Sequence, residues 1–310
     1  MSRSARIAVG PEGLPGWLTE AVLAGGGEVV ALEDADALLW GAPDDPAGLR
    51  EVLDVAGSRL QWVQLPWAGI EPYVPALDSD RLWTCGKGVY AEPVAELALA
   101  LSLAAMRGVD RYARSTRWLE HGHLGVNLRG ARVTVLGGGG ITHVLLRLLA
   151  PFGAGVTVVR NRPEPMDGAA EVVGSSAAEL DAALEGADLV VLALALTADT
   201  EGILDAHRLS LLRGRSVVVN VARGGHVVTD DLVAALRDGT IMGAGLDVTD
   251  PEPLPEGHPL WTMPNCIVTP HVGNTPEMAR PLLAERITTN VARWIAGEDL
   301  LGPVDVRLGY

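Results

Sequence analysis

Short apolar runs rich in β-branched residues recur along this chain and alternate with patterns typical of helices. Residues 189–194 and 216–220, for example, lack the polar alternation of a strand that has one face in water. Strands of that kind are covered by helices on both faces, as in parallel sheets. The pattern therefore predicts an α/β protein with two doubly wound parallel sheets. The predicted strands are 6–9, 28–30, 37–40, 61–65 and 81–84, then 132–136, 156–159, 189–194, 216–220, 243–248 and 266–269.

The length of the chain, 310 residues, is enough for two domains of roughly 150 residues each. A strong helix-forming segment separates the two sets of strands, and a last helical pattern at 276–296 precedes a short tail. We expect the tail to pack back on the first domain, which makes that domain discontinuous. The predicted division is a first domain of 1–93 with 284–310 and a second domain of 94–283.

The charge balance disfavours several kinds of partner. The chain has 24 Lys and Arg against 39 Asp and Glu, a formal charge of 24 − 39 = −15. An envelope this acidic repels both phosphate backbones and anionic lipid headgroups. We therefore expect no nucleic-acid partner, whereas a small anionic substrate can still bind in a locally basic pocket.

The cellular compartment is predicted from cysteine usage and hydropathy. Cys85 and Cys266 have no metal-ligand spacing and are too few to cross-link a chain of this length. The N-terminus passes from a basic start into a strand without the apolar stretch of a signal peptide. The longest apolar helical stretch, 94–106, is shorter than the roughly 20 residues that a membrane span needs. We therefore expect a cytoplasmic protein with no membrane contact and no metal site.

A glycine cluster follows the strand at 132–136 and opens a helix, which is the arrangement of a dinucleotide-binding loop. Gly137 fits the tight turn of such a loop, and Gly139 fits the close approach of backbone to a pyrophosphate. The third glycine is replaced by Thr142, which either shifts the helix outward and weakens binding or is simply accommodated. The alternative is a glycine turn with no ligand. The expected cofactor contacts of this loop are Gly137, Gly139, Gly140 and Ile141.

The end of the second strand of this domain bears on the choice between NAD and NADP. An acidic side chain there binds a ribose 2′-hydroxyl, whereas a nearby arginine accommodates a 2′-phosphate. This chain has Arg160 and Arg162 at that place and no carboxylate. NADP(H) is therefore favoured over NAD(H), and the alternative is two solvated surface arginines.

Three later strands each end in a turn that carries a charged or titratable side chain. These turns hold Arg223, then Asp247 and Glu252, then His271. Ligands of open α/β sheets bind beyond the carboxyl ends of the strands, so these residues are expected to face one crevice. Each residue taken alone is also compatible with an ordinary bonded or solvated side chain.

Together the motifs resemble the D-isomer-specific 2-hydroxyacid dehydrogenases, and the resemblance covers essentially the whole chain. They are VAELALAL at 94–101, the glycine loop, LTADT at 196–200, NVARGG at 220–225, LDVTDPEP at 246–253 and TPHVGNT at 269–275. The resemblance implies a Rossmann cofactor domain inserted in a flavodoxin-like substrate domain, and a homodimer.

The resemblance also implies roles for individual residues. It makes Arg223, Glu252 and His271 the catalytic set, and places Asp247 beside the nicotinamide carboxamide. Further cofactor contacts would come from Thr200, Val221 and Ala222. The substrate carboxylate would be held by the backbone amides of Ala68 and Gly69 together with Arg223, and Trp67 would form a wall of the pocket, the alternative being ordinary packing.

The residue types suit the reduction of a 2-oxo acid by hydride transfer. A histidine can donate a proton near neutral pH, a neighbouring carboxylate favours its charged form, and an arginine can grip a carboxylate. The predicted function is NAD(P)H-dependent reduction of a small 2-oxo acid to the D-2-hydroxy acid, as in glyoxylate/hydroxypyruvate reductases. The alternative is a non-catalytic dinucleotide-binding regulatory protein of the same fold, which Thr142 favours and the catalytic set disfavours.

Overall fold

The computed structural model describes residues 5–43, 45–118, 120 and 125–309, and it divides into two compact units. The terminal unit comprises 1–90 with 275–310, and the central unit comprises 91–274. The unit boundaries coincide with helix ends, since helix α3 (Ala91–Arg107) belongs to the central unit and helix α9 (Pro276–Ala296) to the terminal unit. Boundaries after residues 93 and 283, as expected from the sequence, would cut both helices.

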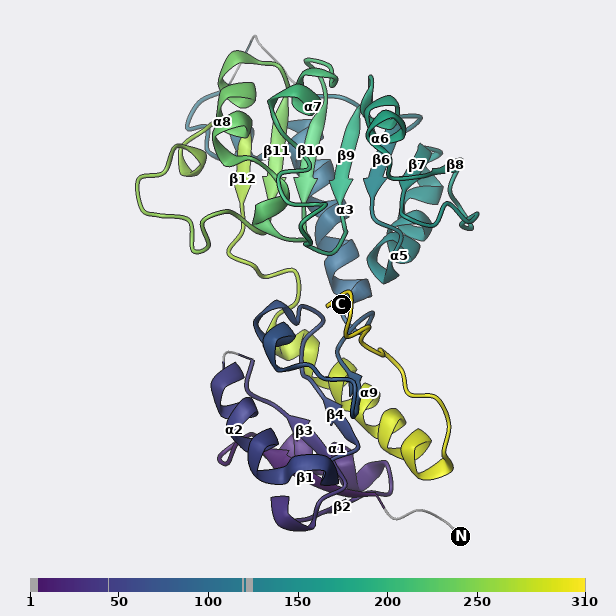
Figure 1. The fold of residues 1–310 in the computed structure, drawn as a ribbon. Coiled ribbons are helices and arrows are strands. Elements are labelled where there is room, and N and C mark those ends of the chain that lie inside the picture. The colour runs from purple at the N-terminus through teal and green to yellow at the C-terminus, as the bar shows by residue number, and fades with distance from the viewer. Residues whose placement is uncertain (1–4, 44, 119, 121–124, 310) are drawn as a thin grey trace. The chain divides into compact units, whose positions relative to one another are not determined.

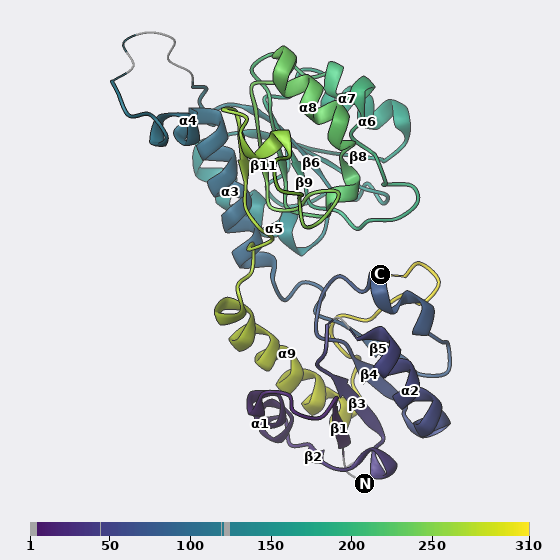
Figure 2. The same ribbon diagram turned by 90° about the vertical axis from the view of Figure 1, so that its left-hand side faces the viewer.

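The terminal unit is built on a parallel five-stranded sheet with the order β2-β1-β3-β4-β5, which is the flavodoxin-like order. Successive residues of its strands point to opposite faces. Ile7 and Leu39 pack against α1 and α9, whereas Ala8 and Leu38 pack against α2. Figure 2 shows these helices on the two sides of the sheet. The elements are β1 (Arg6–Gly10), α1 (Gly16–Ala24), β2 (Glu28–Val29), β3 (Ala37–Trp40), α2 (Pro46–Ala56), β4 (Trp62–Gln64) and β5 (Leu82–Thr84).

The C-terminal tail returns to the edge of this sheet. Thr84 and Pro303 form an antiparallel bridge, and the tail carbonyl of Gly302 accepts a hydrogen bond from the Cys85 amide at 2.9 Å. The buried Asn290 of α9 donates to Gln64 Oε1 and to the Leu301 carbonyl, both at 2.9 Å. Buried polar groups are costly unless paired, so this network fixes helix, strand and tail together.

The central unit has a seven-stranded parallel sheet with the order β12-β11-β10-β9-β6-β7-β8. The chain runs outward from β6 to β8 and then resumes at β9 on the other side of β6, as in a Rossmann fold. Helices α3 and α5 cover one face, and α6, α7 and α8 cover the other (Figure 1). The prediction of two doubly wound parallel sheets is confirmed. The strands are β6 (Arg132–Leu136), β7 (Gly155–Val159), β8 (Glu171–Val173), β9 (Leu189–Leu192), β10 (Val217–Asn220), β11 (Gly243–Leu246) and β12 (Cys266–Val268).

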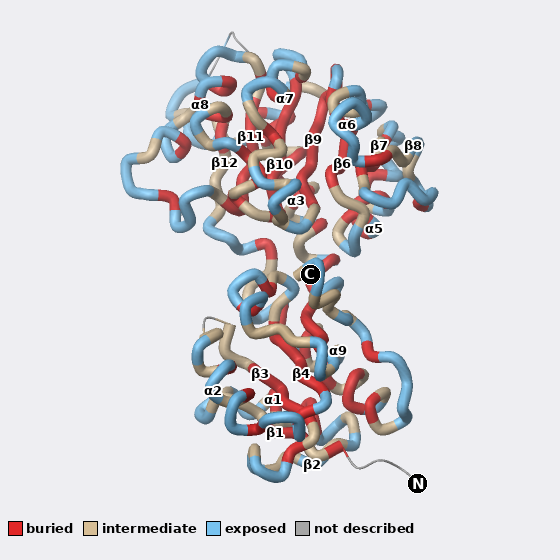
Figure 3. The backbone as a smooth tube through the Cα atoms, in the orientation of Figure 1, coloured by how far each residue is buried: buried red, intermediate tan, exposed pale blue. Residues whose placement is uncertain are grey.

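The helices of the central unit complete its two layers, and strands β9, β10 and β11 between them are buried along their whole length (Figure 3). In the part of the chain that the structure describes, no helix combines the length and the apolar character that crossing a membrane requires. Besides α3, the helices are α4 (Val109–Ala113), α5 (Gly140–Leu149), α6 (Ala177–Leu184), α7 (Ala206–Ser210) and α8 (Thr229–Asp238).

Candidate active site

The glycine loop lies at the switch point of the central sheet, where β6 and β9 are neighbours. Gly137 has φ +106°, and a Cβ atom there would lie 2.3 Å from the Ala193 carbonyl oxygen, so only glycine fits. Gly139 precedes α5, and a Cβ atom there would meet no heavy atom within 4 Å. Gly140 is exposed and Ile141 is half-buried in the first turn of this helix. The open helix N-terminus therefore suits the approach of a pyrophosphate.

Thr142 occupies the place of the third glycine without disrupting the loop. Its side chain is fully buried, and its hydroxyl donates a 2.8 Å hydrogen bond to the carbonyl of Gly137. Thr142 is therefore packed within the loop, and its effect on cofactor binding stays a prediction. The threonine ties the first turn of α5 to the start of the glycine loop.

The two arginines after β7 differ in their surroundings. Arg160 is half-buried and lies against the glycine loop: its Cδ and Nε are 2.7 and 2.8 Å from the position of a Cβ atom on Gly138. Its backbone amide donates a hydrogen bond to the Val173 carbonyl of β8. Arg162 is exposed. Of the two, it is Arg160 whose side chain lies against the loop.

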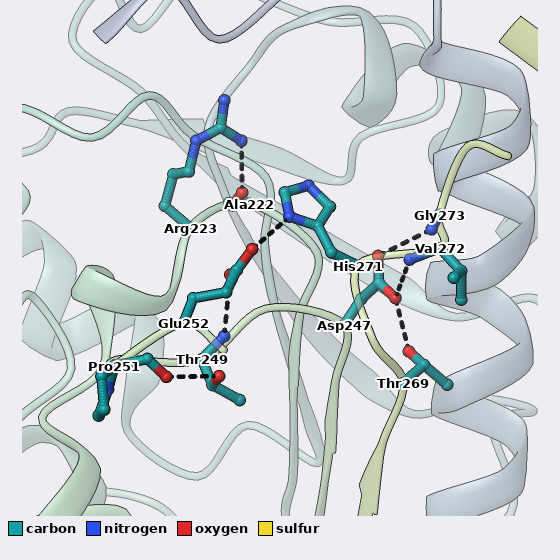
Figure 4. A network of polar contacts seen from close by, with 10 residues as sticks. All are labelled: Ala222, Arg223, Asp247, Thr249, Pro251, Glu252, Thr269, His271, Val272 and Gly273. Atoms are coloured by element: carbon teal, nitrogen blue, oxygen red, sulfur yellow. Dashed lines mark hydrogen bonds and ion pairs between the residues drawn. The ribbon is translucent and has the colours of Figure 1, made fainter. Parts of the chain in front are cut away.

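His271 and Glu252 form a hydrogen-bonded pair beyond the ends of β12 and β11. The imidazole Nδ1 lies 2.7 Å from a carboxylate oxygen of Glu252, and the two side chains are 52% and 42% exposed (Figure 4). His271 has φ +53°, a conformation that few non-glycine residues adopt. Its amide is held by the carbonyls of Asp247 and Thr269, at 2.8 and 3.0 Å. The histidine is thus solvent-accessible but fixed at its backbone.

Asp247 organises the turn that carries His271. Its side chain is buried and accepts three hydrogen bonds, from the Thr269 hydroxyl at 2.6 Å and from the amides of Val272 and Gly273 at 2.9 and 2.8 Å (Figure 4). A carboxylate so engaged fixes the path of the backbone around it. Sequence reasoning did not foresee this role, and the contact with the nicotinamide carboxamide stays a prediction.

Arg223 follows β10 in a turn that is closed by Asn220. The Asn220 amide donates to the Arg223 carbonyl at 2.8 Å, and its oxygen accepts from the Ala222 amide at 3.0 Å. The guanidinium donates to the Ala222 carbonyl at 2.7 Å, and Figure 4 shows it extending to the same side as the His271 ring. Val221 and Ala222 are buried beneath the turn. Sequence reasoning singled out Arg223 but missed the bonds by which Asn220 closes the turn.

Thr200 closes a turn after β9. Its hydroxyl donates to the Ala195 carbonyl at 2.8 Å and accepts from the Thr197 amide at 2.8 Å. The hydroxyl is therefore engaged in shaping the loop. The predicted contact of Thr200 with a cofactor stays a prediction.

The predicted substrate loop lies in the terminal unit, directly after β4. Trp67 is half-buried and packs on Tyr90, with ring centroids 5.7 Å apart, and its carbonyl accepts from the Gly86 amide at 2.9 Å. The Tyr90 hydroxyl donates to the Pro66 carbonyl at 2.9 Å, and burial raises the pKa of this phenol. Ala68 is exposed and Gly69 is half-buried. The loop is thus held from below, with Ala68 presented to solvent.

Residues 97–273 match the family model described as D-isomer specific 2-hydroxyacid dehydrogenase, NAD binding domain. The chain belongs to this family. A human glyoxylate reductase/hydroxypyruvate reductase is 31% identical to this dehydrogenase, over 84% of this chain and 80% of the human one. The family resemblance drawn from the sequence motifs is confirmed.

Two solved structures cover the dehydrogenase almost completely. A family member from Xanthobacter autotrophicus Py2, in complex with NADPH and MES, superposes with a TM-score of 0.84 at 30% identity, over 99% of this chain and 100% of that one. An NADPH-dependent glyoxylate/hydroxypyruvate reductase from Sinorhizobium meliloti, in complex with NADP and sulfate, gives 0.78 at 28% identity, with the same coverage.

Proposed function

We propose that this dehydrogenase reduces a small 2-oxo acid, such as glyoxylate or hydroxypyruvate, to the D-2-hydroxy acid. The observation that carries the proposal is the hydrogen-bonded His271–Glu252 pair at the strand ends that also present Arg223. A protein that only sensed dinucleotides would need no proton donor. The names of the human and Sinorhizobium meliloti relatives support this substrate class.

The described residues support a division of labour in the reduction. A bound NAD(P)H supplies the hydride that reaches C2 of the 2-oxo acid. Because the Nδ1–H of a protonated His271 donates to Glu252, the Nε2–H is left to protonate the forming alkoxide. Glu252 accepts the Nδ1–H hydrogen bond and so fixes the orientation of the ring. Arg223 binds the substrate carboxylate and polarises the ketone, since a guanidinium offers two parallel donors.

The test of this function is turnover with a panel of 2-oxo acids and both cofactors. Purified protein mixed with NADPH and glyoxylate, hydroxypyruvate or phenylpyruvate should consume NADPH, which is followed as falling absorbance. Measurable NADPH binding without turnover of any acid would overturn the proposal in favour of a regulatory dinucleotide-binding protein.

The finer cofactor preference, NADPH over NADH, rests on Arg160. Family membership makes the cofactor NAD(P)(H), and the half-buried Arg160 beside Gly138 supplies a cation where a 2′-phosphate is accommodated. The NADPH and NADP complexes of the two solved relatives support the same choice. The net charge of −15 by itself repels an anionic cofactor and an anionic substrate, so their binding would depend on the positive charges of Arg160 and Arg223.

Replacing Arg160 with Asp should shift the ratio of kcat/KM for NADPH and NADH by about a hundredfold towards NADH. Removing a charged hydrogen bond and adding a repulsive carboxylate is together worth about 3 kcal/mol. The matched control is Arg162→Asp, which makes the same charge change at an exposed site and should move the ratio little. Equal shifts in the two variants would show that Arg160 acts only through net charge.

Thr142 gives a smaller effect that is measured by cofactor binding. Thr142→Val keeps the shape but removes the hydroxyl that donates to the Gly137 carbonyl, so the Kd for NADPH should rise about fivefold. Thr142→Ser restores the hydroxyl and should keep the Kd near that of the parent protein. Fluorescence titration of NADPH measures both. Identical constants for Val and Ser would mean that the hydroxyl does not hold the loop.

We also propose a cytoplasmic homodimer. Trp118 is 90% exposed, and Val109, nine positions before it in the sequence, is also exposed, so both apolar side chains are open to a contact with a second copy of the chain. The loop that follows falls partly on residues 119 and 121–124, which lie outside the described part of the chain. Light scattering at several protein concentrations measures the oligomeric state directly, and a monomer at all of them would contradict the homodimer.

The proposed cytoplasmic location is supported by the cysteines. Cys85 and Cys266 are buried free thiols, which suits a reducing compartment.

A further inference from the structure

A second histidine, His226, lies directly beside Arg223, the arginine that is proposed to bind the substrate. It ends the short 3₁₀ helix Gly224–His226, three positions after Arg223, and its side chain is fully buried. Such burial is compatible with a ring only if both nitrogens find partners. Both do: Nδ1 faces the backbone of Arg223, and Nε2 faces the carbonyl of Ala195.

Both ring nitrogens of His226 lie within hydrogen-bond distance of backbone groups. Nδ1 lies 3.2 Å from the Arg223 amide and 2.9 Å from the Arg223 carbonyl, so the ring packs against both polar groups of that residue. Nε2 lies 3.2 Å from the Ala195 carbonyl.

The partners of His226 belong to two different turns. Arg223 is in the turn after β10, and Ala195 is in the turn after β9, where its carbonyl also accepts from the Thr200 hydroxyl. The same two segments are joined through backbone bonds, from the Gly202 amide to the Gly225 carbonyl at 2.8 Å and from the Leu204 amide to the His226 carbonyl at 2.9 Å. The imidazole is thus a bridge at the end of two neighbouring strands.

The room around this bridge is tightly defined. A Cβ atom on Gly224 would lie 1.9 Å from the Thr249 carbonyl oxygen, so the Arg223 turn is pressed against the segment that leads to Glu252. The same turn contacts the His226 ring through the amide and the carbonyl of Arg223. The position of the Arg223 backbone therefore depends on the ring.

We propose that His226 is a positioning residue that fixes the Arg223 turn and the 195–200 turn in one arrangement. It acts through these two turns and takes no part in proton transfer, because its ring is buried and both nitrogens are engaged. Through Arg223 it positions the guanidinium that binds the substrate carboxylate. Through Ala195 it positions the turn that carries Thr200. The inference rests on the proposed function for the role of Arg223.

Two substitutions separate the two contacts. His226→Asn keeps an acceptor at the place of Nδ1 but does not reach Ala195, whereas His226→Gln places an amide donor near Nε2 and loses the acceptor for the Arg223 amide. We expect the Asn variant to raise the Kd for NADPH about fivefold with little change for oxamate, an unreactive 2-oxo acid analogue. The Gln variant should weaken oxamate binding to the NADPH complex by about the same factor, with little change for NADPH.

The control is a variant that loses stability without touching either turn. Leu180 is a buried residue of α6 that contacts neither ligand in the proposed mechanism. Leu180→Ala leaves a cavity there and should lower Tm while leaving the Kd values for NADPH and oxamate unchanged. The inference is overturned if the Asn and Gln variants weaken both ligands equally, or if neither constant moves. Because NADPH and oxamate binding are measured without turnover, this result is independent of the reduction assay, whose failure alone would overturn the proposed function.

Discussion

Replacing His271 with Asn should lower kcat for reduction of the 2-oxo acid by about a thousandfold, which is the middle of the range for a lost general acid. Asparagine is the suitable replacement because it tolerates the left-handed backbone conformation found here, φ +53°, better than alanine does. The Asp247 bonds that hold the turn come from backbone amides and the Thr269 hydroxyl, so they are kept. The Kd for NADPH should therefore stay within about twofold of the parent value.

The pH dependence gives a second reading of the same variant. Reduction needs the protonated imidazole, so the rate for the parent protein should fall as rising pH removes the proton, while oxidation of the D-2-hydroxy acid should gain. In the Asn variant both dependences should flatten. A variant that lost kcat but kept the slope of the parent would place the proton donor elsewhere.

His207 provides the matched control for this experiment. It is also exposed and lies beside a carboxylate, with Nε2 3.6 Å from Asp181, on helix α7 of the same unit. His207→Asn makes the same residue change at another exposed histidine beside a carboxylate and should leave kcat unchanged. If the two variants lost activity alike, or if His271→Asn weakened NADPH binding as much as turnover, the acid role would be contradicted.

The architecture was readable from the sequence because burial on both faces of a strand excludes polar residues from it. The runs at 189–194 and 216–220 became β9 and β10 for this reason. Strand β8 (Glu171–Val173) was missed, since three residues at a sheet edge, none of them buried, leave no such pattern. The unit boundaries lie at the starts of α3 and α9, and the helical patterns in the sequence did not predict that the units divide at these points.

The candidate site was predicted in its side chains but not in its supports. Arg223, Glu252 and His271 lie in motifs, so their residue types and spacing identified them. The groups that Asp247 binds include backbone amides, which every sequence contains, and so its hold on the His271 turn could not be read from residue letters. His226 adjoins the NVARGG motif, but only the structure shows which backbone groups face its ring: the amide and carbonyl of Arg223 and the carbonyl of Ala195.

Arg223→Lys should lower kcat/KM for the 2-oxo acid by about a hundredfold while leaving the Kd for NADPH unchanged. Lysine keeps the charge but loses the planar pair of donors, and a hydrogen bond to a charged group is worth about 1.5–3 kcal/mol. Most of the loss should fall on KM, because the carboxylate is bound in the ground state as well as in the transition state.

Two further measurements decide whether substrate binding needs the planar pair of donors of the guanidinium. In Arg223→Ala, free guanidinium ion should restore part of kcat/KM, whereas ammonium should not, since only the former reproduces two parallel donors. Arg237→Lys, at the exposed end of α8, is the control for the same change of residue and should match the parent protein. Full activity in Arg223→Lys would mean that charge alone holds the substrate. The precise placement of the Arg223 turn by Asn220 and His226 would then serve stability and not substrate recognition.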